Sequence, residues 1–119
     1  MNASVIRRPL VGSIAHPNEL DCKRIERALA ARKRYRYVSA NVKQVRGGYL
    51  IESCCCSRNI DKDGGVIHVA LIHYDTVSRT WKLFRKNHAR GIWEFYSIYP
   101  RLNSAIDDLN TDSERLFWQ

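Results

Sequence analysis

The chain has 119 residues, of which 45% are hydrophobic, so it can form one ordinary hydrophobic core but not two full-sized domains. Its formal net charge of +8 favours a partner that carries negative charge. The sequence contains no signal-peptide pattern and no uninterrupted apolar run of the roughly 18 residues that a membrane span needs. We therefore expect a cytoplasmic protein with no membrane partner.

The first sixteen residues show no periodicity and contain Pro9 and Gly12, which predicts a flexible N-terminal arm over residues 1–16 and a single α+β domain over residues 17–119. Asn18 can accept a hydrogen bond from the amide of Asp21 as a helix N-cap. Apolar residues then recur at helical spacing, which predicts a helix from Asn18 to about Lys33. The apolar face consists of Leu20, Ile25, Ala28 and Leu29.

Two alternating segments follow this helix, and the pair Gly47-Gly48 between them is typical of a two-residue hairpin turn. A turn at these two glycines places Val42 opposite Ser53 and Ala40 opposite Cys55. The segments therefore predict the first two strands of an antiparallel sheet.

Residues 66–99 predict three more strands with an unusual density of aromatic side chains. Short hairpin loops at residues 76–79 and 87–91 separate them. The expected pairs are Tyr74 with Trp81, Ile72 with Leu83, and Leu83 with Phe95. We expect this aromatic meander to bury Trp81, Trp93 and Phe95 and so to supply much of the core.

Pro100 ends the last strand, and residues 102–109 predict a short amphipathic C-terminal helix. Phe117 and Trp118 should dock on the domain, because two large aromatic side chains at a chain end would otherwise face water. The predicted fold class is α+β, with a five-stranded antiparallel sheet, an N-terminal helix on one face and a short C-terminal helix.

The sequence contains no complete motif for a metal or cofactor site. The four cysteines, Cys22, Cys54, Cys55 and Cys56, should be reduced thiols, since neighbouring strand residues point to opposite faces. Cys54 and Cys56 with His68 or His73 lack paired zinc-ligand spacing. The calcium-like loop at residues 59–64 lacks its bidentate Glu, because Ala70 stands at the twelfth position. We expect no metal and no cofactor, and we expect His16 and His88 to be solvated.

Basic and aromatic residues alternate where the predicted helix gives way to the first strand: Arg32, Lys33, Arg34, Tyr35, Arg36 and Tyr37. This pattern suits phosphate contacts together with base stacking on single-stranded nucleic acid. A simpler interpretation is a solvated helix end whose cations complement the helix dipole. The preferred function is thus a non-enzymatic binding module for an anionic partner, either nucleic acid or an acidic protein.

Two alternatives remain open. The basic first third and the acidic end of the chain could equally be complementary within one molecule or across a homodimer contact. The other alternative is a small thiol- or carboxylate-dependent enzyme, with a site near Glu52 and Cys54–Cys56. A cross-strand partner such as Lys43 is the simpler explanation for Glu52.

Several motifs together resemble a bacterial family of small proteins, the domain-of-unknown-function family three thousand and twenty-four. They are Ala70-Leu71-Ile72-His73-Tyr74, Trp81-Lys82-Leu83-Phe84, Trp93-Glu94-Phe95-Tyr96 and the tail from Asp112 to Gln119. The chain departs from the family pattern at Glu94, where a His is expected, at Gln119, where a Gly is expected, and at residues 54–57, which replace a Pro-Pro-Trp-like stretch. The resemblance implies a helix, a hairpin and an aromatic meander, and it brings no activity or cofactor.

Overall fold

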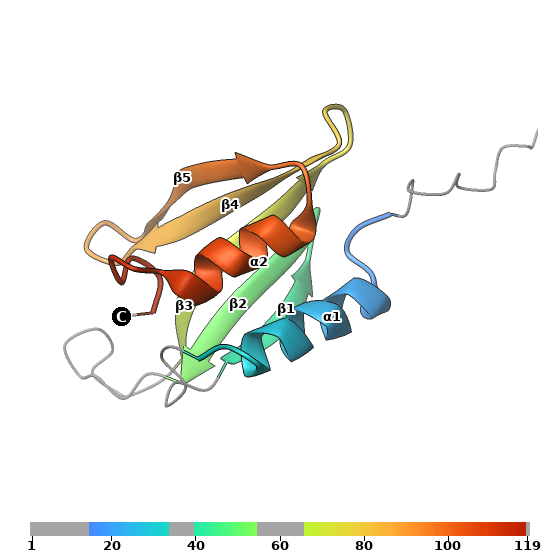
Figure 1. Ribbon diagram of the computed structural model, residues 1–119. Coiled ribbons are helices and arrows are strands. Elements are labelled where there is room, and N and C mark those ends of the chain that lie inside the picture. The colour runs from blue at the N-terminus through green and yellow to red at the C-terminus, as the bar shows by residue number, and fades with distance from the viewer. Residues whose placement is uncertain (1–14, 34–39, 55–65, 119) are drawn as a thin grey trace, which may run out of the picture.

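The computed structural model describes residues 15–33, 40–54 and 66–118. Two helices cover one face of a five-stranded antiparallel sheet whose strands follow chain order (Figure 1). The elements are α1 (Glu19–Ala30), β1 (Ala40–Val45), β2 (Gly48–Cys54), β3 (Val66–Asp75), β4 (Thr80–Asn87), β5 (Ile92–Tyr99) and α2 (Leu102–Thr111). The predicted α+β class is therefore confirmed.

Helix α1 begins as predicted and ends three residues early. Asn18 Oδ1 accepts a hydrogen bond from the Asp21 amide at 2.8 Å. The last helical residue is Ala30, although the apolar pattern predicted Lys33. The carbonyl of Leu29 in the last turn accepts from the Arg32 backbone amide at 3.2 Å and from Arg32 Nη1 at 2.7 Å, so the Arg32 side chain caps this end of the helix.

The first hairpin turns one residue earlier than predicted, so its register differs by two residues. Ala40 pairs with Ser53 and Val42 pairs with Ile51. Of the two glycines, only Gly47 has a positive φ, of 80°. Gly48 lies in β2 against β3, where a Cβ atom would collide with the carbonyl oxygen of Ile72. The second glycine is therefore needed for close strand packing, and not for the turn.

Strand pairing in the aromatic meander is partly as predicted. Tyr74 pairs with Trp81 and Ile72 pairs with Leu83. The predicted pair of Leu83 with Phe95 is wrong, because Leu83 pairs with Ser97 and the next residue, Phe84, pairs with Phe95. One extra residue in β5, Tyr96, forms a β-bulge between these two pairs.

The bulge changes which aromatic side chains enter the core. Trp81 is buried as expected, but Trp93 is only half-buried and Phe95 is 57% exposed. The prediction that Trp93 and Phe95 supply much of the core is therefore wrong. Tyr96 packs instead edge-on against Phe117, with ring centroids 5.1 Å apart.

A second bulge lies in β3. Ile51 pairs with Ala70 and Glu52 pairs with His68, which leaves Val69 as the extra residue. Val69, Ala70 and Ile67 are all buried. The bulge thus lets two consecutive residues of one strand, Val69 and Ala70, both enter the core.

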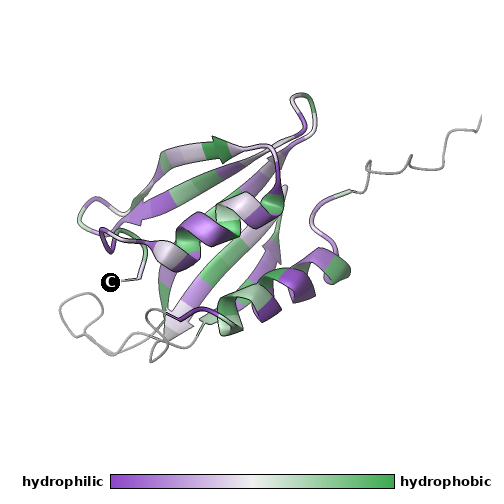
Figure 2. Cartoon of the chain, in the orientation of Figure 1, coloured by the Kyte–Doolittle hydropathy of each residue, from purple (hydrophilic) through white to green (hydrophobic). Residues whose placement is uncertain are grey.

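The core lies between the sheet and the two helices. Helix α1 contacts β1, whereas α2 contacts β4 and β5 (Figure 1). Hydropathy alternates along both helices and along the strands that they cover (Figure 2). The most enclosed side chains are Trp118, Tyr49, Phe117, Ile25, Leu29, Ile51, Ile72, Leu83, Leu109, Val69 and Ser53.

The C-terminal tail is held by a buried carboxylate. Asp112 accepts hydrogen bonds from three backbone amides, those of Leu116 at 2.7 Å, Phe117 at 3.0 Å and Trp118 at 2.9 Å. The Trp118 indole donates to the carbonyl of Leu109 at 2.8 Å, and the Arg32 guanidinium lies 4.2 Å over its ring. Phe117 and Trp118 are 2% and 1% exposed, so their predicted docking is confirmed.

We predict that Asp112→Asn lowers the free energy of unfolding by about 2–3 kcal/mol, because the buried amides lose a charged acceptor. Asn tolerates the left-handed φ of 34° at this position, so the change isolates the carboxylate. Urea unfolding, monitored by Trp fluorescence, measures the change in the free energy of unfolding. Asp107→Asn on the exposed side of α2 should alter stability by less than about 0.5 kcal/mol, and equal effects of the two variants would contradict the role of Asp112.

Candidate functional site

The sheet face opposite the helices carries a mixed aromatic and basic surface, here called the open sheet face. Strand alternation places its side chains in three rows across the five strands. The rows are Val45, Gly48, His73, Lys82 and Ile98; Lys43, Leu50, Leu71, Phe84 and Phe95; and Asn41, Glu52, His68, Lys86 and Trp93. In the third row, His68 on β3 is not paired with a residue of β4. Its ring instead stacks on the Trp93 ring of β5.

Aromatic rings on the open sheet face contact one another and remain accessible. Phe84 and Phe95 meet edge to face at 5.8 Å, and the His68 and Trp93 rings stack at 5.6 Å with an interplanar angle of 15°. Phe95 is 57% exposed and Ile98 is 48% exposed. Large apolar side chains gathered on one surface are characteristic of interaction sites.

Cations flank these rings. Lys86 Nζ lies 4.9 Å over the Trp93 ring, which is a cation–π contact. Lys82 forms an ion pair with Asp75 at 3.4 Å, and burial and Lys82 both lower the pKa of neighbouring His73. Both lysines stand in β4 beside the exposed aromatic rings.

Positive charge is concentrated in the sheet layer. The described helices and tail, residues 15–33 and 101–118, hold seven basic and seven acidic side chains. The described sheet segments, residues 40–54 and 66–100, hold seven basic and three acidic side chains. Each of the three sheet carboxylates already has a cationic partner: Glu52 pairs with Lys43, Asp75 with Lys82, and Glu94 with Arg85. The net positive charge of the described residues therefore comes from the sheet segments.

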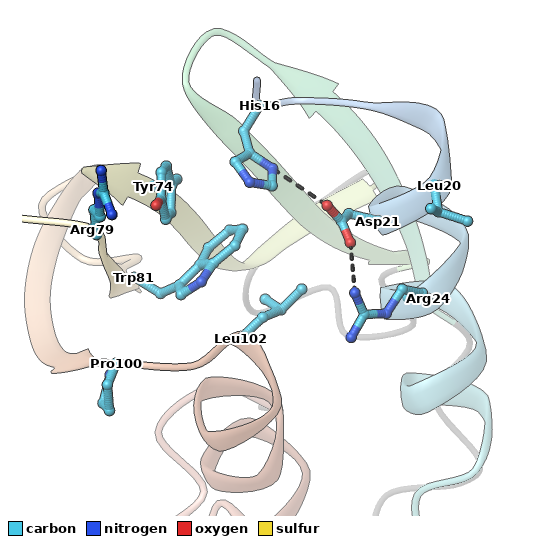
Figure 3. Close-up of a pocket in the computed structure, with 9 residues that line it drawn as sticks. All are labelled: His16, Leu20, Asp21, Arg24, Tyr74, Arg79, Trp81, Pro100 and Leu102. Atoms are coloured by element: carbon cyan, nitrogen blue, oxygen red, sulfur yellow. Dashed lines mark hydrogen bonds and ion pairs between the residues drawn. The ribbon is translucent and has the colours of Figure 1, made fainter. Parts of the chain in front are cut away.

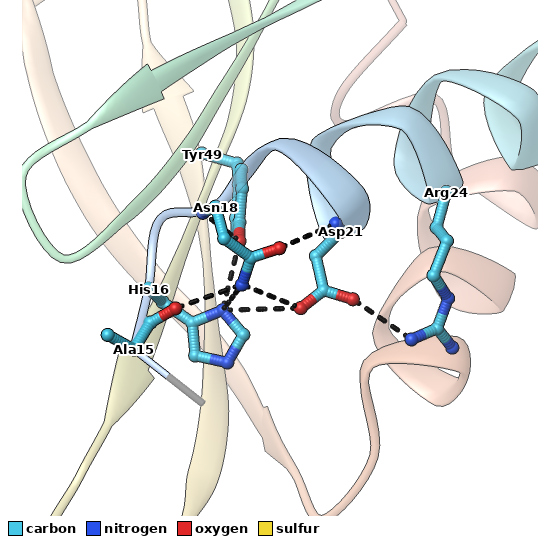
Figure 4. Close-up of polar contacts among 6 residues, drawn as sticks. All are labelled: Ala15, His16, Asn18, Asp21, Arg24 and Tyr49. Carbon is cyan, nitrogen blue, oxygen red and sulfur yellow. Dashed lines mark hydrogen bonds and ion pairs between the residues drawn. The ribbon is translucent and has the colours of Figure 1, made fainter. Parts of the chain in front are cut away.

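A second polar cluster surrounds His16 at the start of α1 (Figure 4). The His16 side chain is only 8% exposed, so the prediction that it is solvated is wrong. It contacts the rings of Tyr74 and Trp81 at 4.7 Å and 4.6 Å. Asp21 Oδ2 lies 3.6 Å from Nδ1, while Asp21 Oδ1 accepts from Arg24 at 2.9 Å. No sequence motif marks this cluster, because it joins the chain before α1 to strands β2 to β4.

The hydrogen bonds assign the tautomer of His16. Tyr49 Oη accepts from the Asn18 amide at 3.0 Å and lies 2.9 Å from His16 Nδ1. Among the described contacts of this buried hydroxyl, Nδ1 is the only acceptor, so Tyr49 donates to it. The Asn18 side-chain amide, 3.3 Å away, also directs a donor at Nδ1. Neutral His16 therefore carries its proton on Nε2.

A cavity of about 280 Å³ opens beside His16, between α1 and the ends of β3 and β4 (Figure 3). Its lining residues are His16, Leu20, Asp21, Arg24, Tyr74, Arg79, Trp81, Pro100 and Leu102. The cavity lies on the helix side of the sheet, because Trp81 and Tyr74 face the core. It is thus separate from the open sheet face.

The structure divides the predicted basic cluster. Arg32 is 7% exposed and packs on Trp118, so it is part of the interior, and burial lowers the pKa of its guanidinium. Its bond to Leu29 agrees with the expected cation at the end of the helix, but the expectation that this helix end is solvated is wrong for Arg32, because its side chain is buried. Lys33 is exposed. Arg34, Tyr35, Arg36 and Tyr37 lie outside the described residues.

The predicted alternative site near Glu52 is partly described. Glu52 is 5% exposed and forms an ion pair with Lys43 at 3.3 Å, so the cross-strand partner expected from sequence is present; His68 Nε2 lies 3.6 Å from its other carboxylate oxygen. Cys55, Cys56 and the side chain of Cys54 lie outside the described residues. Among the residues that are described, no group of three or more His, Cys, Asp or Glu side chains could hold a metal ion.

The family model for a domain of unknown function, DUF3024, matches residues 14–119. The chain therefore belongs to this family, as the motifs in the meander and tail predicted. No curated protein and no solved structure matches the chain. Within the described part of the chain, no helix is long and apolar enough to cross a membrane.

We predict that stability falls as the pH decreases below about 6.5, and that His16→Asn reduces this dependence. Burial lowers the pKa of His16 more than Asp21 raises it, so the unfolded chain binds the proton more readily and acid favours unfolding. The rings of Tyr49 and Tyr74 also pack against His16.

Urea unfolding at several pH values between 5 and 7 measures the effect. His73 and His88 also have lowered pKa values, so the variant should retain part of the pH dependence. Long-range ¹H–¹⁵N NMR should show an unprotonated Nδ1 at neutral pH. A pH dependence identical to wild type would contradict the buried neutral His16.

Proposed function

We propose that the protein is a binding module for single-stranded nucleic acid and that the open sheet face is its binding surface. The observation that carries this proposal is the combination of accessible aromatic rings and lysines on a sheet face that neither helix covers. Single-stranded nucleic acid is bound in this way elsewhere, with bases stacked on aromatic side chains and phosphates held by cations.

The arrangement of side chains supports a ligand that is both flat and anionic. Phe95 provides exposed ring surface in β5, half-buried Phe84 meets it edge to face from β4, and half-buried Trp93 adds a third ring that contacts Lys86. Lys82 and Lys86 stand two strand positions beyond Phe84 on either side, on the same face. An acidic protein would use the cations but would not require accessible ring faces.

The predicted cluster extends this proposal along the chain. Lys33, Arg34, Tyr35, Arg36 and Tyr37 precede Ala40, the first residue of β1, by only a few positions. They repeat the same mixture of cations and rings. We propose that they contribute further phosphate and stacking contacts, whereas Arg32 acts inside the fold.

We predict that Lys82→Gln/Lys86→Gln weakens binding to a fluorescent oligothymidylate and flattens the slope of log affinity against log salt by about 1.4, at roughly 0.7 for each phosphate that a lysine no longer neutralises. Phe95→Ala should cost about 1–3 kcal/mol of binding free energy if one base stacks on its ring. Fluorescence anisotropy across a salt titration measures both quantities.

Matched controls lie on α1. Lys23→Gln/Arg27→Gln removes the same charge from the exposed side of the helix, and Leu20→Ala removes an exposed apolar side chain. These variants should bind as wild type does. The proposal fails if wild-type protein ignores the oligonucleotide at low salt or if the helix variants lose as much affinity as the sheet variants. It also fails if sedimentation shows a dimer that Phe95→Ala dissociates, since the face would then serve self-association.

A further inference from the structure

The cavity beside His16 is lined by both apolar and polar side chains (Figure 3). The Trp81 indole lies at its centre, with His16 on one side and Leu102 on the other, while Arg79 and Arg24 stand at opposite ends. Leu20 at the rim is 68% exposed, although Trp81 and Leu102 are only 7% and 6% exposed. A partly apolar cavity with converging polar groups is the usual form of a small-molecule site.

The polar groups of the cavity are mainly donors. Asp21 is the single carboxylate in the lining, and its oxygens are already engaged by Arg24 at 2.9 Å and by the Asn18 amide at 3.0 Å. The neutral His16 ring offers an N–H at Nε2, because Nδ1 accepts from Tyr49. A ligand that fits this lining must therefore supply acceptors.

The charged side chains that line the cavity indicate which charge a ligand should carry. The positive charge of Arg24 is balanced by Asp21. Within the described part of the chain, no carboxylate forms an ion pair with Arg79, which lies at the end of the β3–β4 hairpin. One uncompensated guanidinium matches one negative charge, and its planar fork matches a carboxylate.

The volume of the cavity limits the size of the ligand. A volume of about 280 Å³ lies just below the roughly 300–1,000 Å³ of typical ligand sites, which leaves room for one aromatic ring and a short side chain. Trp81, which lies between the two ends of the cavity, supplies apolar surface against which such a ring would pack.

We propose that this cavity binds a small aromatic monocarboxylate, with its carboxylate at Arg79 and its ring against Trp81. The site lies on the helix side of the sheet and shares no residue with the open sheet face. It therefore stands or falls independently of nucleic-acid binding.

Phenylacetate and its neutral analogue phenylacetamide are suitable probes. In ¹H–¹⁵N NMR titrations, phenylacetate should shift the Trp81 indole N–H signal, assigned by Trp81→Phe, and phenylacetamide should bind at least about tenfold more weakly. Arg79→Gln should weaken phenylacetate binding by about tenfold or more and leave phenylacetamide binding unchanged.

Arg90→Gln is the matched control, since Arg90 is an exposed arginine in the opposite hairpin. It should bind phenylacetate as wild type does, and thermal unfolding verifies that both variants fold. Equal binding of the acid and the amide, wild-type affinity in Arg79→Gln, or no shift of the Trp81 signal with either probe would each overturn the proposal.

Discussion

One extra residue in β5 determines how the aromatic side chains are shared between the two faces of the sheet. Without the bulge at Tyr96, the register that pairs Leu83 with Ser97 would continue and place Phe95 opposite Arg85, with its side chain toward the helices. With it, Phe95 faces away from the helices, and Tyr96 meets Phe117 in the tail. The core and the open sheet face therefore depend on the same local change of register. A one-residue shift in a strand moves every following side chain to the other face.

The features of the fold that the sequence predicted correctly are those that depend on residues close together in the chain. The Asn18 cap, the hairpin at residues 76–79 and the apolar face of α2 each depend on neighbours in the chain, and each is present. The bulges at Val69 and Tyr96 depend on packing between distant elements, and no Gly or Pro marks them. The first hairpin shows the same limit, since two adjacent glycines serve different purposes and only contact with β3 distinguishes them.

The candidate sites were less accessible to sequence reasoning. The basic and aromatic pattern indicated an anionic ligand, but it gave no sign that Arg32 would cap a helix and cover Trp118. The cluster at His16 joins residues 33 positions apart in sequence, through a contact with Tyr49. The family motif in the tail has a structural explanation, because Asp112 holds the backbone that carries Phe117 and Trp118. The side chains of Phe117 and Trp118 close the core.

The unequal distribution of charge between the two layers also has a consequence at a distance. A neutral helix layer stacked on a positive sheet layer gives the described part of the molecule an electric dipole directed across the sheet. A polyanion approaching within about a Debye length, roughly 8–10 Å at physiological ionic strength, would exert a torque on this dipole. For the described residues, this torque favours an orientation in which the sheet faces the polyanion before any atoms touch.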